Sequence, residues 1–209
     1  MAFDGDLEIH ITVADGGGNL AGLPAVAASL GWKYLRIELS RGETVSQPML
    51  TRHVKGDLNA AKQAANDVVN VLNATGFSVT RTKIEAAPWN TDVPQTDADA
   101  VPERHFEAHI KLLLPPNHDT TALVAVAVRH GAHLSRNAFK HRADGHAERF
   151  VTVRAFGVGA DTAKTRVAAL LAGVAPLGFP VLDAEEEYVI FDSNLSVDNG
   201  WLTPQETTQ

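Results

Sequence analysis

The chain contains no cysteine, no long apolar run and no surplus of positive charge. The absence of cysteine excludes disulfides, thiolate zinc sites and cysteine nucleophiles, and it is compatible with a reducing compartment. No apolar stretch is long enough for a membrane-spanning helix. The first ten residues lack the basic and apolar regions of a secretory signal. We therefore expect a soluble, cytoplasmic protein that has no membrane partner.

The charge distribution argues against nucleic acid as a partner. The formal net charge is −7. Segments 87–103 and 192–209 contain four and three acidic residues and no basic residue, so the remainder of the chain is nearly neutral. Nucleic-acid-binding proteins need a basic surplus to neutralise phosphates. We expect a small-molecule ligand instead, and a homo-oligomer remains open.

The sequence contains two similar halves. The segment Leu7-Glu8-Ile9-His10-Ile11-Thr12 reappears as Phe106-Glu107-Ala108-His109-Ile110-Lys111. Gly76-Phe77 is matched in the same order by Gly178-Phe179. An ordered series of such matches predicts an internal duplication.

Hydropathy periodicity predicts the same order of elements, β-α-β-β-α-β, in both halves. In the first half we expect a strand at 7–13, a helix at 20–30, strands at 32–39 and 45–53, a helix capped by Asp57 and stopped by Gly76, and a strand at 77–86. In the second half the expected elements are 105–114, 119–131, 132–140, 147–156, 160–177 and 179–191, with helices at the second and fifth positions.

This order predicts an α+β fold, a tandem duplication of a ferredoxin-like βαββαβ unit with two four-stranded antiparallel sheets and helices on the outer faces. The predicted organisation is a first repeat at 1–86, a Pro/Asp-rich linker at 87–103, a second repeat at 104–191 and a C-terminal tail at 192–209. Leu195, Val197 and Trp201 of the tail are expected to pack back on the body. The favoured arrangement has the repeats packed through their open sheet faces, and the rival is one continuous β-barrel.

Strand alternation places charged side chains on the sheet faces opposite the helices. These candidates come from the first and last strands of each repeat: Glu8, His10, Lys83, Glu85, Glu107, His109, Lys111, Glu185 and Glu187. Four arginines are further candidates, although alternation does not fix the sheet face on which they lie: Arg36, Arg52, Arg136 and Arg154. Charges in central strands are expected to pair, to coordinate a metal or to bind a ligand.

Two chemistries fit these residues. In the first, His10, Glu85, His109 and Glu187 coordinate one divalent metal (Mn, Fe, Ni, Zn or Mg), a set that resembles in outline the site of vicinal-oxygen-chelate (glyoxalase-like) proteins. In the second, the Glu107-x-His109-x-Lys111 strand resembles the Glu-x-Glu-x-Lys strand of triphosphate-processing tunnel enzymes, which implies phosphate binding. Neither partial resemblance identifies a family, and no nucleotide-cofactor motif is present.

The predicted function is binding of a small anionic or phosphorylated ligand in a polar cleft between the repeats. One hypothesis is that the protein also turns this ligand over. As an enzyme it would be a hydrolase or lyase, with His10, His109, Glu8 and Glu107 as acid/base groups. The ligand would be held by Arg36, Arg52, Lys83, Lys111, Arg136, Arg154 and Glu185. The alternatives are a non-catalytic sensor and a structural interaction module with an ion-paired interface between the repeats.

Overall fold

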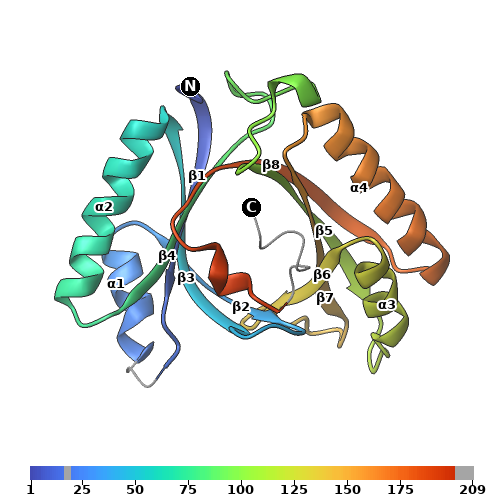
Figure 1. The fold of residues 1–209 in the computed structure, drawn as a ribbon. Coiled ribbons are helices and arrows are strands. Elements are labelled where there is room, and N and C mark those ends of the chain that lie inside the picture. The colour runs from blue at the N-terminus through green and yellow to red at the C-terminus, as the bar shows by residue number, and fades with distance from the viewer. Residues whose placement is uncertain (17–19, 201–209) are drawn as a thin grey trace.

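The computed structural model describes residues 1–16 and 20–200. Its elements follow the α+β order in both halves of the chain (Figure 1). The first half contains β1 (Gly5–Val13), α1 (Leu23–Ser29), β2 (Lys33–Leu39), β3 (Ser46–Gly56), α2 (Leu58–Ala74) and β4 (Val79–Ala86). The second half contains β5 (His105–Leu114), α3 (Thr121–Arg129), β6 (Ala132–Asn137), β7 (Ala147–Phe156), α4 (Ala160–Val174) and β8 (Val181–Asp192). Short 3₁₀ turns occupy Leu20–Gly22, Asp97–Asp99, Ala175–Leu177 and Leu195–Asp198.

Local chemistry explains the bounds of α2. The Asp57 carboxylate accepts a 2.8 Å hydrogen bond from the Ala60 amide, as expected of an N-cap. Gly76 adopts φ +87°, a left-handed conformation that ends helices at low cost when the residue is glycine. Between these ends, the helix buries one apolar stripe: Ala61, Ala65, Val68 and Leu72. The predicted cap and stop of this helix are confirmed.

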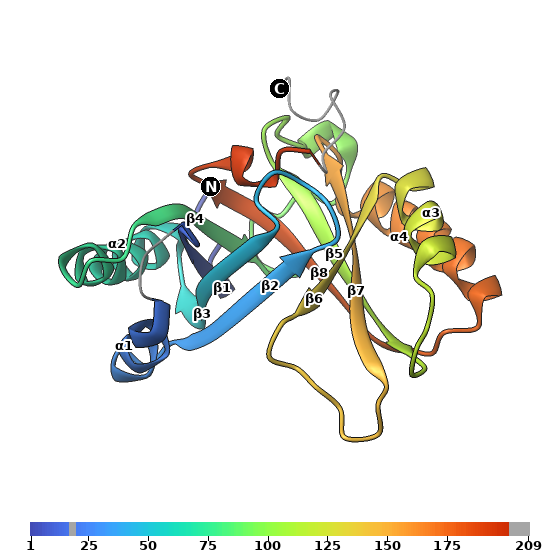
Figure 2. The same ribbon diagram turned by 90° about the horizontal axis from the view of Figure 1, so that it is seen from below.

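The eight strands form one closed barrel in the order β1-β3-β2-β6-β7-β5-β8-β4. Each half contributes four adjacent strands in the ferredoxin-like order, β4-β1-β3-β2 and β8-β5-β7-β6. The halves join where β2 pairs with β6 and β4 pairs with β8, and Figure 2 shows β2 and β6 side by side. The ferredoxin-like prediction is thus confirmed for the sheets.

The favoured packing of the repeats through their sheet faces is wrong, and the rival single barrel is right. The physical reason is that edge strands carry unpaired backbone N–H and C=O groups, which barrel closure satisfies. Face packing would instead have buried the charged inner faces against each other. The barrel keeps these faces around an internal space.

The hydrophobic core lies outside the barrel, between the sheet and the helices. One cluster packs α1 and α2 on the first half, and a second packs α3 and α4 on the other half. Leu7, Ile9 and Ile11 of β1 point into the first cluster, as their alternation predicts. Within the described residues, no helix is long and apolar enough to cross a membrane.

The described part of the tail turns back onto one end of the barrel. Val197 and Asp198 are buried, and the Glu43 amide donates a 2.9 Å hydrogen bond to the Asn199 carbonyl. The packing expected for Val197 is therefore confirmed. Trp201 lies outside the described residues.

Candidate functional site

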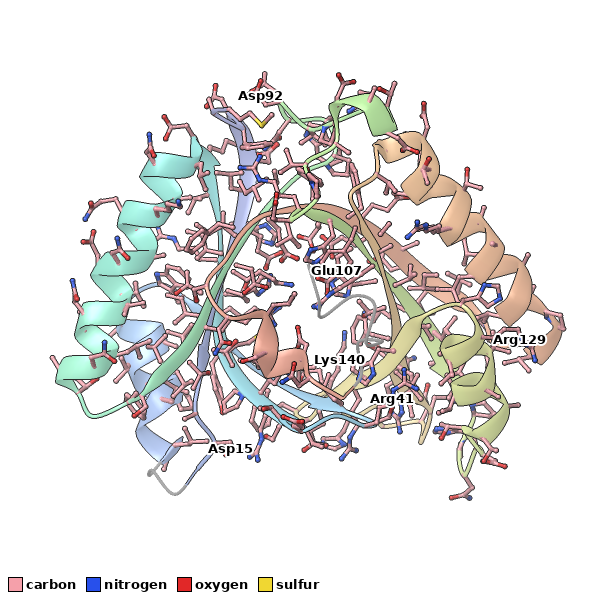
Figure 3. The ribbon with its side chains drawn as sticks, viewed as in Figure 1. Asp15, Arg41, Asp92, Glu107, Arg129 and Lys140 are labelled. Carbon is pink, nitrogen blue, oxygen red and sulfur yellow. The ribbon has the colours of Figure 1, made fainter. Side chains whose placement is uncertain are left out.

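The barrel encloses a cavity of about 850 Å³. Its lining includes exposed side chains, among them Lys33, His53 and Phe139, so the cavity reaches the molecular surface. Figure 3 shows Glu107 and Lys140 inside the ring of strands and Asp15 and Arg129 outside it.

Alternation along the strands places most of the predicted site residues on this lining. Those in the lining are Glu8, His10, Arg52, Lys83, Glu107, His109, Lys111, Arg154, Glu185 and Glu187. Glu85 is 1% exposed and lies behind the lining, in contact with His10 and Lys83. The structure therefore brings together residues from strands that are far apart in the sequence.

Arg36 and Arg136 are not part of this lining. Arg36 contacts Asp15 at 2.8 Å and donates to the Ser46 hydroxyl, and Arg136 pairs with Glu38 on the outside of the barrel. The prediction that these two arginines point into the site is corrected. In β2, Leu35 and Ile37 line the cavity, so Arg36 between them lies on the outer face. In β6, Ser135 and Asn137 line the cavity, so Arg136 between them also lies on the outer face.

A chain of alternating charges crosses the cavity wall. His10 Nε2 lies 2.6 Å from Glu85 Oε2, and Lys83 Nζ lies 2.7 Å from Glu85 Oε1 and 3.3 Å from Glu107 Oε2. Arg154 Nε continues the chain at 3.2 Å from Glu107 Oε2. Each buried charge in this chain has a partner of opposite sign, which offsets its desolvation cost.

The pKa values of these groups follow their partners. Burial alone would raise the pKa of Glu85, but Lys83 and His10 outweigh it and hold that pKa far below its usual value. Burial likewise opposes ionisation of Glu107, and Arg154 and Lys83 reverse this to hold its pKa well below its usual value. Burial disfavours the charged form of Lys83, yet Glu107 and Glu85 raise its pKa above its usual value. All three groups are therefore charged at neutral pH.

A second cluster closes the end of the cavity where the tail enters. Asp198 is 2% exposed, and its carboxylate accepts hydrogen bonds from Arg81 at 2.7 Å, from Arg154 at 2.9 Å and from the Gln47 amide at 3.1 Å. Arg81 also pairs with Asp192 at 2.5 Å. Burial alone would raise the pKa of Asp198, but Arg154 and Arg81 lower it far below its usual value.

Sequence reasoning missed Asp198, Gln47 and Asp192 as members of the site. Asp198 lies 151 positions from Gln47 and 117 positions from Arg81 in the sequence. No local sequence pattern connects residues that are so far apart. The sequence signal that points to Asp198 is its position next to the apolar Val197, which was expected to pack against the body.

Glu107, Glu187 and His109 form a third group. Glu107 and Glu187 are register partners across β5 and β8. His109 Nε2 lies 3.6 Å from Glu107 Oε1 and 3.7 Å from Glu187 Oε2, and its Nδ1 lies 2.9 Å from the Thr152 hydroxyl. Burial raises the pKa of Glu187 well above its usual value, and the charge of Glu85 raises it further. Burial also lowers the pKa of His109.

Two other buried histidines are neutral at physiological pH. Burial lowers the pKa of His133 to about 4, with a further contribution from Arg41. Burial also lowers the pKa of His105, whose ring packs 4.3 Å from that of Phe156.

Among the residues that the structure describes, two sets of side-chain oxygen and nitrogen atoms are spaced closely enough for a metal ion. Glu85, Glu107 and His109 form one set and Glu8, Glu185 and Glu187 the other, with the atoms of each set within 4.8 Å of one another. The Lys83 ammonium group lies against two carboxylates of the first set and supplies a positive charge there. Coordination by His10, Glu85, His109 and Glu187 stays a prediction.

Opposite the charged wall lies an apolar one. Leu35, Ile37 and Leu39 of β2 and Met49 of β3 line the cavity and are only partly buried. They belong to neither hydrophobic core. Phe139 also lines the cavity, and its ring centroid lies 5.4 Å from that of Tyr34, which packs against the first hydrophobic core.

A cationic cluster surrounds Glu148 beside these aromatic rings. Glu148 is contacted by Lys111 at 3.1 Å, by Lys140 at 3.0 Å and by Arg142 at 3.4 Å. Lys111 Nζ also lies 5.8 Å from the Phe150 ring centroid, and both residues line the cavity. Arg142 also contacts Asp144 at 3.1 Å, so three cations face two carboxylates and one positive charge remains in excess at this end.

Comparison with known proteins identifies no family. No family model and no curated protein matches the chain. Among solved structures, the small subunit of acetolactate synthase from Thermotoga maritima is 13% identical over 90% of this chain and 95% of that one, with a TM-score of 0.30. The regulatory subunit of aspartate kinase from Thermus thermophilus is 14% identical over 81% and 92%, with a TM-score of 0.35. A protein from Bacteroides thetaiotaomicron is 12% identical over 87% and 93%, with a TM-score of 0.31. Similarities of this size do not indicate a shared function.

Proposed function

We propose that the barrel cavity binds a small organic anion whose apolar part is about the size of an aromatic ring. The observation that carries this proposal is the apolar wall formed by Leu35, Ile37, Leu39 and Met49, which faces a charged wall across about 850 Å³. A cavity of this size is within the range that small-molecule sites occupy, and such sites combine apolar lining with a few polar groups.

The apolar wall supports a ligand with a hydrophobic body. Large apolar side chains outside the core gain free energy when a ligand removes their surface from water, by about 25 cal/mol per Å². Phe139 lines the cavity and is 56% exposed, so it offers a ring against which a flat group can pack.

The cationic cluster at Glu148 supports a negative charge on the ligand. Lys111 and Lys140 line the cavity beside Phe139 and Phe150, so an anionic group held there would leave the ligand body against the rings. On the opposite wall, Lys83 pairs with Glu85, Arg81 with Asp198 and Arg154 with Glu107. A carboxylate, sulfonate or phosphate would serve equally as the anionic group.

The fluorescent anion 8-anilinonaphthalene-1-sulfonate tests this function, because it combines an aromatic body with one negative charge. We expect saturable binding with increased fluorescence, while the aromatic cation thioflavin T binds at least tenfold more weakly. Ile37→Asp should lower the affinity for the anion at least tenfold, because it places a carboxylate in the apolar wall. Val128→Asp, on an exposed position of α3, is the matched control.

The double variant Lys111→Gln and Lys140→Gln should also weaken binding of the anion, whereas Lys164→Gln, at an exposed position of α4, should not. Equal binding of the anion and the cation, or binding unaffected by both cavity variants, would contradict the proposal. The protein would then fit the alternative, a structural module whose internal charges serve only to pair. Binding alone does not separate a sensor from an enzyme.

A further inference from the structure

Three carboxylates from β1 and β8 form a cluster on the cavity wall. Glu8, Glu185 and Glu187 each offer one oxygen, and these oxygens lie within 4.8 Å of one another. Glu185 and Glu187 are two residues apart on one strand, so both point to the same face. The last register pair between β4 and β8 is Ala86 with Tyr188, so both glutamates lie beyond the paired end of β4. We call Glu8, Glu185 and Glu187 the carboxylate cluster.

No lysine or arginine pairs with the carboxylate cluster. Among the described residues, the basic nitrogens within 4.0 Å of its oxygens all belong to histidines. His53 Nε2 and His10 Nε2 lie 3.6 and 3.9 Å from oxygens of Glu8. His109 Nε2 lies 3.7 Å from Glu187 Oε2. Three negative groups are thus gathered without a permanent positive charge beside them.

Glu187 is the buried member of the cluster. It is 8% exposed, and its carboxyl group makes no hydrogen bond to a residue that the structure describes. The nearest basic nitrogen, at 3.7 Å, lies beyond hydrogen-bonding distance. Its oxygen is directed instead to those of Glu8 and Glu185. Because buried carboxylates are normally paired with a cation or coordinate a metal ion, Glu187 points to a cation bound at this cluster.

The other closely spaced set of possible ligands differs in one respect. In the set of Glu85, Glu107 and His109, the Lys83 ammonium group lies 2.7 and 3.3 Å from the two carboxylates. A positive charge is therefore already present there. The carboxylate cluster has no such group, so it is the set at which an added cation is most favourable.

The ligand atoms indicate the kind of cation. Three carboxylates supply only oxygen, which suits hard cations such as Ca²⁺, whereas Zn²⁺ sites use nitrogen or sulfur ligands more often. Ca²⁺ binds oxygen at about 2.3–2.6 Å, so two such bonds span about 4.6–5.2 Å, in agreement with the spacing of the cluster. Mg²⁺ requires shorter bonds in a near-ideal octahedron.

The surroundings of the cluster also suit a bound ion. Glu185 is exposed, so the ion can enter from solvent and water molecules can complete its coordination. The Thr51 hydroxyl donates a hydrogen bond to Glu8 Oε1 and thereby orients this carboxylate. The second oxygen of Glu8 remains available to the ion.

We propose that Glu8, Glu185 and Glu187 bind one Ca²⁺ ion on the cavity wall. The ion joins β1 of the first half to β8 of the second, beside the junction where β4 pairs with β8. It offsets the repulsion among the three carboxylates, and because it binds the folded chain it stabilises the closed barrel. This proposal is independent of organic-anion binding.

Calorimetric titration of EDTA-treated, dialysed protein with CaCl₂ tests the site, and thermal denaturation is the second readout. We expect one ion per chain and a rise in Tm that saturates with CaCl₂ concentration. Glu185→Gln and Glu187→Gln should each weaken binding at least about tenfold, because each removes a charged ligand. Glu186→Gln is the matched control. Glu186 lies between them but borders Arg166 of α4 outside the barrel, so the affinity should change less than twofold.

Two further measurements separate this site from its alternatives. His10→Ala should retain Ca²⁺ binding, because no imidazole is a ligand. Loss of binding in His10→Ala with retention in Glu185→Gln would overturn the proposal in favour of the predicted site that contains imidazoles. Absence of binding at millimolar CaCl₂, equal affinity for Mg²⁺, or an equal loss in Glu186→Gln would also overturn it. Binding of 8-anilinonaphthalene-1-sulfonate with EDTA present shows separately whether the proposed function holds.

Discussion

Glu107 and Glu187 face each other across β5 and β8, yet the pKa of Glu107 is held well below its usual value and that of Glu187 is raised well above it. The difference comes from Arg154 and Lys83, which contact only the first. Two residues of the same type in adjacent positions thus acquire different chemistry from their surroundings.

The raised pKa of Glu187 has a consequence for stability. Because its folded pKa is raised, the folded state binds a proton more tightly than the unfolded state, and stability falls as pH rises from about the usual value of 4.5 through the folded pKa. Glu187→Gln should therefore stabilise the fold at neutral and alkaline pH, by about 1.4 kcal/mol for each pKa unit that the change relieves. Urea denaturation at several pH values measures this. An equal effect at pH 4 and pH 8 would contradict a raised pKa.

The Asp198 cluster should contribute strongly to stability. Asp198→Ala leaves Arg81 and Arg154 without one buried anionic partner, and removing one member of a buried pair costs about 3–5 kcal/mol. Glu38→Ala breaks the more exposed pair with Arg136 and should cost about 0–1 kcal/mol. Urea denaturation of both variants compares them directly. Equal losses would show that the tail contributes little to the barrel.

Lys83 should oppose the predicted metal binding by His10, Glu85, His109 and Glu187. Its ammonium group lies against Glu85 and Glu107, so we expect Lys83→Gln to bind Mn²⁺ or Zn²⁺ at least tenfold more tightly than the unaltered protein does. Lys111→Gln is the control. Calorimetric titration measures both, with elemental analysis of protein purified without chelator. Stoichiometric metal in the unaltered protein, lost in His10→Ala and His109→Ala, would contradict this and support the metal prediction.

Much of the site was predictable from strand alternation. The inward phase of Glu8 and His10, and of Glu107 and His109, follows from a period of two residues combined with apolar neighbours that face the helices. The same reasoning failed for β2. Its inward residues Leu35 and Ile37 are the apolar ones, so the pattern that placed charge inside elsewhere placed Arg36 outside.

The sequence by itself determined the order of elements, the α2 cap at Asp57 and the inward phase of β1 and β5, because these depend on hydropathy period and local hydrogen bonding. Only the tertiary structure decided that β2 pairs with β6 and β4 with β8, because unsatisfied strand edges can be paired in more than one way. That closure created the cavity and allowed Asp198 to reach two distant arginines. The ionisation of Glu187 is likewise a tertiary property, since burial and the distance to each charge set it.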